Sequence, residues 1–151
     1  MTMNDSHNKW MKVAIKQALI ALKNNEIPIG AIVVKDNKVI GHGYNSIETY
    51  KKATAHAEIL AIESASIFLN NWRLVNCDLY TTLEPCVMCS GAIIKSRIKN
   101  IFFGAYSKEG CVSSLYNLCN DNRFNHVSGI KGGLLEKDCN KLLCNFFENK
   151  A

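Results

Sequence analysis

The sequence Thr82-Leu83-Glu84-Pro85-Cys86-Val87-Met88-Cys89 joins the end of an apolar β run to the beginning of a helix. Residues 79–83 have the length and composition of a short strand. Proline is favoured in the first turn of a helix, so Pro85 predicts a helix over residues 86–96. Cys86 and Cys89 are three positions apart, which places both thiols on one face of this helix. The junction therefore predicts a strand followed by a helix that presents two thiols at its N-terminus.

The hydrophobic pattern on either side of this junction predicts the other elements. Apolar residues at helical spacing indicate a helix over residues 8–24 and another over residues 55–69, with Thr54 as the N-cap of the second. Two short β runs, joined by a tight Asp-Asn turn, predict a hairpin. The remaining expectations are the hairpin strands over 29–35 and 38–44, strands over 98–105 and 127–130, a loop over 106–125 with room for one helical turn, and a helix over 136–147.

The order of these elements predicts the architecture. Helices lie between the later strands, and such an order requires crossover connections. We therefore expect an α/β fold, a three-layer α/β/α sandwich around a mixed five-stranded sheet. The 151 residues contain no repeat, low-complexity tract or linker, so we expect a single domain over residues 1–151.

Composition excludes several classes of protein. With 48% hydrophobic and 21% charged residues, the chain is neither disordered nor collagen-like. Seven cysteines, an odd number, and a polar N-terminus argue against a secreted disulfide framework. No stretch approaches the roughly 20 apolar residues that cross a bilayer. We therefore expect a cytoplasmic protein with reduced thiols and no membrane partner.

The charge is mildly basic and unevenly distributed. The net charge is +5, and residues 91–151 carry nine Lys and Arg against five Asp and Glu. A polyanionic partner and an ordinary solvated basic surface both account for this excess. Within it, Lys95, Arg97 and Lys99 are candidates for phosphate contacts or for a solvated face.

His56 is the candidate for a third ligand beside the two cysteines. Zinc takes thiolate and imidazole ligands in a tetrahedral arrangement, and a structural zinc needs four of them from the protein. The sequence has no second Cys-x-x-Cys pair, and the other histidines have no paired spacing. His56, Cys86 and Cys89 would leave the fourth position to water, which is the pattern of a catalytic zinc.

Glu58, two residues after His56, indicates that the candidate metal site is catalytic. Two thiolates weaken zinc as a Lewis acid, so a nearby carboxylate that takes and returns a proton assists the chemistry. Positions two apart on a helix differ by about 200°. His56 and Glu58 can therefore converge only if the metal lies over the N-terminus of their helix. The alternative for Glu58 is a first-turn carboxylate that interacts with the helix dipole.

His56-Ala57-Glu58 together with Pro85-Cys86-Val87-Met88-Cys89 resembles the zinc-dependent cytidine and adenosine deaminase superfamily. Within it, the sequence resembles the bacterial tRNA-specific adenosine deaminases over almost the whole chain. The segments that carry this likeness are Ile27-Pro28-Ile29-Gly30-Ala31, Asn71-Trp72-Arg73-Leu74, residues 79–84, residues 90–98, Phe103-Gly104-Ala105, Phe124-Asn125-His126 and Phe146-Phe147.

The resemblance implies an activity and a set of partners. It implies a homodimer that converts the wobble adenosine of a tRNA anticodon stem–loop to inosine. One Zn²⁺ per chain would be bound by His56, Cys86 and Cys89, and Glu58 would shuttle protons while ammonia leaves C6 of the flipped adenine.

The resemblance also implies substrate contacts. Asn45 would hydrogen-bond the base, and Phe147 would lie near the anticodon nucleotides; the alternatives are a turn asparagine and a helix-end aromatic packed in the core. The family usually has an aspartate in the loop after Phe-Gly-Ala, where this chain has a shorter loop over residues 106–110 with Ser107 nearest that position. The family's last helix commonly continues into basic residues, where this chain has residues 148–151.

Two other functions remain open at this point. The first is deamination of a free base or nucleoside, of the guanine or cytosine type, on the same scaffold. The second is a non-catalytic, zinc-stabilised RNA-binding module, against which Glu58 argues because binding alone needs no unligated carboxylate at the metal. The sequence leaves open whether His126 faces the site or caps a loop, and Cys111 is most simply a small buried apolar residue.

Overall fold

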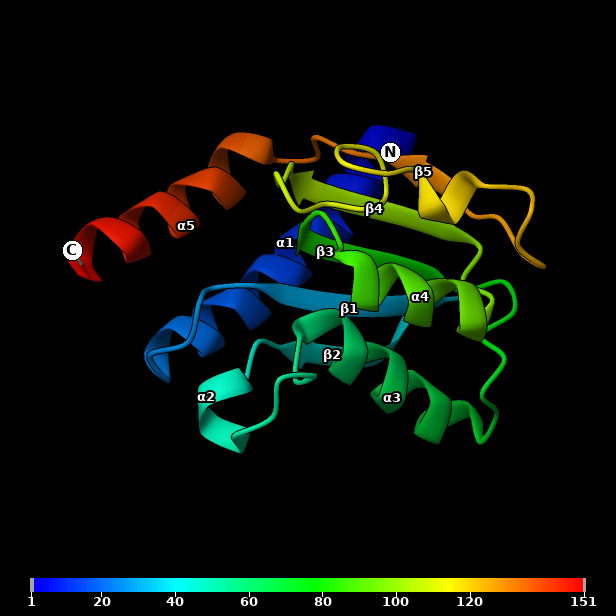
Figure 1. Cartoon of the computed structure of the whole chain (residues 1–151), viewed down its shortest axis with the longest axis horizontal. Coiled ribbons are helices and arrows are strands. Elements are labelled where there is room, and N and C mark those ends of the chain that lie inside the picture. The colour runs from blue at the N-terminus through cyan, green and yellow to red at the C-terminus, as the bar shows by residue number, and fades with distance from the viewer. Residues whose placement is uncertain (1, 151) are drawn as a thin grey trace.

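The computed structural model describes residues 2–150, and its centre is a five-stranded sheet with the strand order β2-β1-β3-β4-β5 (Figure 1). β1 runs antiparallel to both β2 and β3, whereas β3, β4 and β5 are parallel. The predicted mixed five-stranded sheet is therefore confirmed. The strands are β1 (Gly30–Lys35), β2 (Lys38–Tyr44), β3 (Asp78–Leu83), β4 (Asn100–Ala105) and β5 (Gly129–Lys131).

Helices cover both faces of the sheet, which confirms the three-layer arrangement (Figure 1). Alternate residues of each strand point to opposite faces. Ile32 and Tyr80 accordingly pack with Met11 beneath the first helix, whereas Val33 and Leu79 belong to the core on the other face. The helices are α1 (Met3–Lys23) and α5 (Glu136–Lys150) on one face, α3 (Ala57–Leu69) and α4 (Val87–Ser96) on the other, and two short turns, α2 (Ile47–Tyr50) and the 3-10 helix Leu118–Asn120.

The first helix begins earlier than the hydrophobic pattern predicts. It starts at Met3 because Thr2 and Asp5 form a capping box: the Asp5 N–H donates to the Thr2 hydroxyl oxygen, and the Thr2 N–H donates to the Asp5 carboxylate. These polar residues add a turn that apolar periodicity does not detect.

The prediction of Thr54 as the N-cap of α3 is wrong. The chain makes a tight turn before the helix, in which the Ala55 N–H donates to the Lys52 carbonyl and the His56 N–H donates to the Thr54 carbonyl. The chain is still extended at His56 (φ −76°, ψ 151°), so His56 occupies the N-cap position. In the same way Cys86, with φ −77° and ψ −176°, is the N-cap of α4, and Pro85 lies just before it.

The other boundaries lie within three residues of the predicted ones, β2 has the predicted bounds, and α2 was not predicted. The helical turn expected in the loop over residues 106–125 is present at Leu118–Asn120. Within residues 2–150, none of the helices combines the length and the hydrophobicity that a bilayer-spanning segment requires.

Candidate active site

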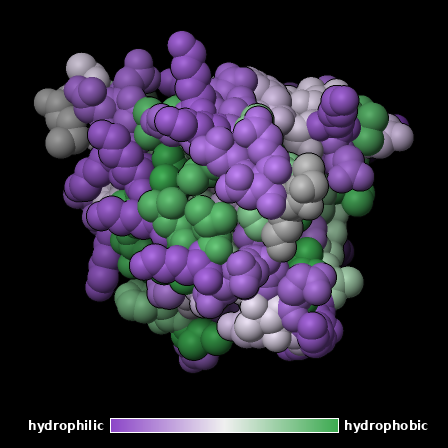
Figure 2. Space-filling view, turned by 90° about the vertical axis from the view of Figure 1, so that its left-hand side faces the viewer, coloured by the Kyte–Doolittle hydropathy of each residue, from purple (hydrophilic) through white to green (hydrophobic). Residues whose placement is uncertain are grey.

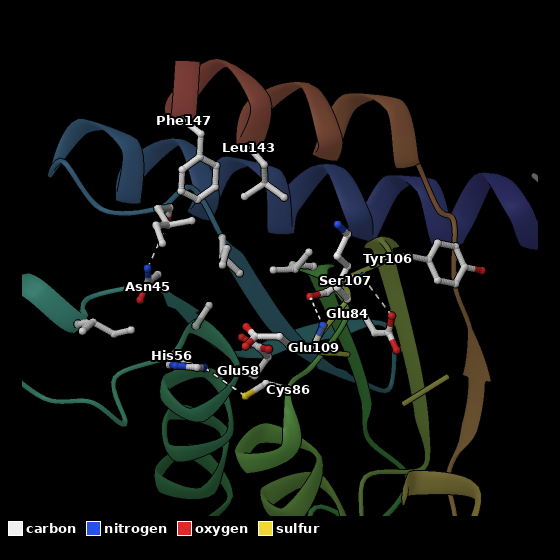
Figure 3. A pocket seen from close by; sticks show the side chains of 16 residues that line it. Asn45, His56, Glu58, Glu84, Cys86, Tyr106, Ser107, Glu109, Leu143 and Phe147 are labelled. Atoms are coloured by element: carbon white, nitrogen blue, oxygen red, sulfur yellow. Dashed lines mark hydrogen bonds between the residues drawn. The ribbon is translucent and has the colours of Figure 1, made fainter. Parts of the chain in front are cut away.

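The N-termini of α3 and α4 meet beside the carboxyl ends of β3 and β4, and they bring three predicted ligands together. His56 caps α3, Cys86 caps α4, and Cys89 lies in the first turn of α4. Their ligand atoms all lie within 4.8 Å of one another. The His56 Nδ1 is 3.6 Å from the Cys86 Sγ (Figure 3), and it is 3.4 Å from the Cys89 Sγ. This cluster could hold one metal ion.

Glycines on β2 determine where α3, and with it His56, can lie. Gly41 and Gly43 face the backbone of α3, and a Cβ atom on Gly43 would lie 2.5 Å from the Ala57 carbonyl oxygen and 2.7 Å from the Ala61 nitrogen. Such an approach is possible only where both surfaces lack larger side chains. The first turn of α3 therefore rests directly on β2.

The electrostatics of the cluster favour negative charge on sulfur. A hydrogen bond from the Cys89 thiol, together with one from His56, lowers the pKa of Cys86 to about 3. The hydrogen bond to Cys86 raises the pKa of Cys89, because Cys89 is the donor, and burial raises it further. A separate hydrogen bond, from the His56 ring to Cys86, raises the pKa of His56. Two helix N-termini add their positive dipole ends. Two sulfurs and one imidazole nitrogen, with one of the sulfurs held as a thiolate, suit a divalent cation that accepts soft ligands.

Glu58 lines the same cavity as His56 and Cys86 (Figure 3). Its side chain is buried in the first turn of α3, and burial raises its pKa to about 7. The expected convergence of His56 and Glu58 is therefore found over the helix N-terminus. A carboxyl group with this pKa can both take and release a proton near neutral pH.

The cavity above this cluster has a volume of about 450 Å³. Leu143 and Phe147 point into it from α5 (Figure 3). Figure 2 looks onto the side of the molecule where β3 and β4 end, and it shows apolar side chains ringed by hydrophilic ones. The other lining residues are Ile27, Ile29, Asn45, Ile47, Ala57, Leu83, Glu84 and the loop residues 106–109.

Asn45 offers the cavity a polar atom that lacks a partner. Its side chain is 4% exposed, and its Nδ2 donates to the Ile27 carbonyl at 3.4 Å. Its Oδ1 finds no hydrogen-bond partner within residues 2–150. Because buried polar atoms are rarely left unpaired, this oxygen points to a ligand with an N–H or O–H donor.

Several other candidates lie outside the cavity. The Nε2 of His126 is 2.6 Å from the Ile98 carbonyl oxygen, so His126 closes the loop before β5. Arg97 and Lys99 lie at the opposite edge of the sheet, where β4 begins. Lys95 is exposed near the C-terminal end of α4. Cys111 is buried, and its thiol donates to the Glu109 carbonyl at 3.5 Å.

Two buried carboxylates beside the cavity were missed. Glu26, 2% exposed, accepts hydrogen bonds from the Thr49 N–H and hydroxyl and from the Glu48 N–H, and so fixes α2. Glu84, also 2% exposed, accepts hydrogen bonds from the loop that follows β4. The position of Glu84 in the Thr-Leu-Glu-Pro-Cys string marks it for attention, but its partners are more than 20 residues away in sequence.

Comparison with known proteins places these features in a family. The model of the MafB19-like deaminases matches residues 5–147. A protein of Buchnera aphidicola subsp. Schizaphis graminum named tRNA-specific adenosine deaminase is 46% identical over 141 residues, which are 93% of each chain.

Two solved structures of deaminases are also similar to this chain. One, from work on A-to-I editing by tRNA:A34 deaminases at the wobble position of transfer RNA, has a TM-score of 0.86 and 37% identity, and the match covers 89% of this chain and 99% of that one. The second is a guanine deaminase from Bacillus subtilis, with a TM-score of 0.65 and 39% identity over 68% of this chain and 66% of that one.

Proposed function

Because the chain belongs to the family of bacterial tRNA-specific adenosine deaminases, we propose that it hydrolyses adenosine to inosine at the wobble position of a tRNA anticodon. The observation that carries this proposal is the cluster of His56, Cys86 and Cys89 at the cavity that the buried Glu58 also lines. A metal-binding module without catalysis has no use for the last of these residues.

The donor set supports zinc as the metal, one ion per chain. One imidazole nitrogen and two sulfurs within 4.8 Å of one another match three corners of a zinc tetrahedron. A bound ion would supply the Lewis acidity that activates water for the reaction. His56, Cys86 and Cys89 would hold it, with both thiols lying at the positive end of α4.

Glu58 moves the protons of the reaction. The carboxylate would take one proton from the attacking water and pass it to the ring nitrogen, and would then carry the second proton, from the hydroxyl group now on C6, to the departing amino group. Its pKa of about 7 suits both directions of transfer, because burial removes the water that would otherwise stabilise the charge.

Asn45 and Phe147 would recognise the substrate. The unpaired Oδ1 of Asn45 can accept a hydrogen bond from the base. Phe147, which is 54% exposed, offers a ring at the mouth of the cavity, where an unpaired base can stack on it. This partial exposure supports an RNA contact rather than a place in the core.

The test compares substrates of different size. The zinc-loaded protein is incubated with an anticodon stem–loop that carries a wobble adenosine, and separately with free adenosine, cytosine and guanine. We expect inosine in the stem–loop and no turnover of the free compounds. Turnover of free guanine or cytosine alone would instead favour a base deaminase, to which the likeness to the Bacillus subtilis enzyme points.

We also propose one deaminase domain over residues 1–151 that works as a homodimer in the cytoplasm, where tRNA is found. Apolar side chains exposed on α4 and on the connection after β4 support a second copy as the occupant of this face: Val87, Leu115, Tyr116 and Phe124. Sedimentation of wild type and Val87→Glu tests this, since the charged side chain should shift a dimer towards monomer. A wild-type monomer at micromolar concentration would contradict it.

A further inference from the structure

Glu84 is tied to a loop that lies more than 20 residues away in sequence. Its Oε1 accepts a hydrogen bond from the Ser107 N–H at 3.2 Å and another from the Ser114 hydroxyl. Its Oε2 accepts hydrogen bonds from the N–H groups of Ser113 and Ser114 at 2.8 and 2.9 Å. The carboxylate therefore satisfies backbone N–H groups of a loop segment that is not part of the sheet.

The loop is shaped around this carboxylate. Gly110 is buried against Glu84, and a Cβ atom on Gly110 would overlap the carboxylate. Within the loop, the Gly110 N–H donates to the Ser107 carbonyl at 3.0 Å, and the Leu115 N–H donates to the Gly110 carbonyl at 2.7 Å. Both turns thus close around the side chain of Glu84.

The same loop forms one wall of the cavity. Ser107, Lys108 and Glu109 line it, and Figure 3 shows Ser107 across the cavity from Asn45. The Glu109 N–H donates to the Ser107 hydroxyl at 3.2 Å, so the position of Ser107 also determines where the Glu109 backbone lies. Of the loop residues that Glu84 holds, Ser107 lines the cavity, and Lys108 and Glu109, which also line it, follow Ser107 directly in the chain.

We propose that Glu84 is a positioning residue that holds residues 107–114 in the conformation that forms the substrate-facing wall of the cavity. The inference rests on the proposed function, because it assigns the wall to a nucleotide next to the reacting base. Glu84 itself makes no contact with the reacting atoms. Its role is to keep Ser107 and Lys108 in place beside the substrate.

A purely structural role at the metal centre is the competing explanation, because Cys86 follows two residues later. The connection to the loop extends to this segment too: the Glu84 N–H donates to the Ala105 carbonyl, and the Cys111 N–H donates to the Pro85 carbonyl, both at 2.9 Å. The two explanations differ in what changes when the carboxylate alone is altered. A metal-centre role predicts loss of metal and of kcat, whereas a loop role predicts a rise in KM with the metal retained.

Glu84→Gln is the first test, because it keeps the shape and replaces one acceptor oxygen with an NH₂ group that faces N–H donors. With the stem–loop as substrate, we expect KM to rise about tenfold and kcat to stay within about twofold, with metal content unchanged. Asp121→Asn is the matched control: its carboxylate caps the exposed turn at Arg123 further along the same connection, and its kinetics should equal those of wild type.

Amide hydrogen exchange gives a second reading that does not depend on activity. In Glu84→Gln, the N–H groups of Ser107, Ser113 and Ser114 should exchange about tenfold faster, because they lose a buried acceptor. Gly110→Ala disturbs the same contact from the side of the loop, because the added methyl group would displace the Glu84 carboxylate. We expect it to raise KM and to speed amide exchange at the same residues.

Unchanged exchange at these three amides, or a fall in metal content that parallels the loss of kcat, would overturn the proposal. If the wild type turns over only a free base, the proposed function fails, while the exchange experiment still decides whether Glu84 holds the loop.

Discussion

Glu58 and Glu84 are 4% and 2% exposed and lie beside the same cavity, yet their surroundings give them opposite chemistry. Burial raises the pKa of Glu58 to about 7. Burial alone would also raise the pKa of Glu84, but hydrogen bonds from Ser114, Ser113 and Ser107 lower it below its ordinary value. The pKa shifts therefore favour the charged form of Glu84, which holds backbone N–H groups, whereas they bring the pKa of Glu58 close to neutral pH.

Glu58→Gln separates a proton carrier from a metal ligand. The amide keeps the shape of the side chain but cannot carry the proton, so we expect turnover to fall by about 10² to 10⁴. Metal content, measured by atomic emission, should stay at about one ion per chain. Glu63→Gln, an exposed position on the same helix, is the control and should retain full activity. Loss of the metal in Glu58→Gln would mean that Glu58 is a ligand.

His7 makes stability depend on pH. Burial, and then the nearby Lys131, lowers the pKa of His7, whose Nδ1 lies 2.7 Å from the Tyr80 hydroxyl. The folded protein therefore binds fewer protons here than the unfolded chain. The contribution is complete above the ordinary histidine pKa of about 6.5 and is lost as the pH falls through that value towards the lower folded pKa.

We expect His7→Asn to reduce the fall in Tm between about pH 7.5 and about pH 5.5. The same change at the exposed His42 should leave that fall as it is in wild type. Calorimetry at both pH values measures the difference. An identical fall in His7→Asn and wild type would remove His7 as the cause.

At the scale of elements, the site depends on how closely α3 lies against β2. Gly41 and Gly43 alternate along β2, and Ala57, Ala61 and Ala65 follow at four-residue spacing on α3. The periods of strand and helix thus bring small residues together along one contact line. The N-terminus of α3, where His56 and Glu58 lie, is fixed by this packing.

Gly43→Ala should therefore destabilise the protein and disturb the site together. The methyl group would meet the Ala57 carbonyl and the Ala61 nitrogen, so we expect a loss of about 1–3 kcal/mol in the free energy of unfolding. Gly91→Ala on α4 is the control: apart from the adjoining residues and the backbone of its own helix, no atom of residues 2–150 lies within 4 Å of the added methyl, and helix propensity favours Ala by about 0.5–1 kcal/mol. Urea unfolding checks both, and equal stability of the two variants would contradict the close packing.

At the scale of the whole molecule, basic residues are found at both ends of strands β3 and β4. Lys108 lines the cavity, whereas Arg73, Arg97 and Lys99 lie where β3 and β4 begin. Each of these strands has six residues, so the two ends are about 20 Å apart. An anticodon loop bound in the cavity would therefore contact Lys108 rather than Arg97 or Lys99.

The salt dependence of KM tests which end meets RNA. For the stem–loop, log KM should rise with log salt concentration, and Lys108→Ala should reduce this slope by roughly one phosphate contact. Lys99→Ala, at the opposite edge, should leave the slope unchanged. A slope that falls only in Lys99→Ala would show that the RNA lies on the other side.

The sequence predicted the elements well because each has a local cause. Apolar spacing indicated the core helices and strands, and the fold class followed from their order. The boundaries that were wrong depended on polar contacts, such as the capping box at Thr2 and the turn before His56. The spacing of apolar residues does not predict these hydrogen bonds.

By itself, the sequence determined which residues could form a metal site and a proton carrier. His56, Cys86 and Cys89 are residue types that bind zinc, and they occur with Glu58 in a His-x-Glu and a Cys-x-x-Cys pattern. Only the tertiary structure decided that two helix N-termini bring these groups to one cavity, that Asn45 keeps an unpaired oxygen there, and that Glu84 anchors a distant loop. The physical reason is range. Residue types and spacing act within a turn or two of chain, whereas burial and hydrogen bonding depend on which distant segments the sheet brings together.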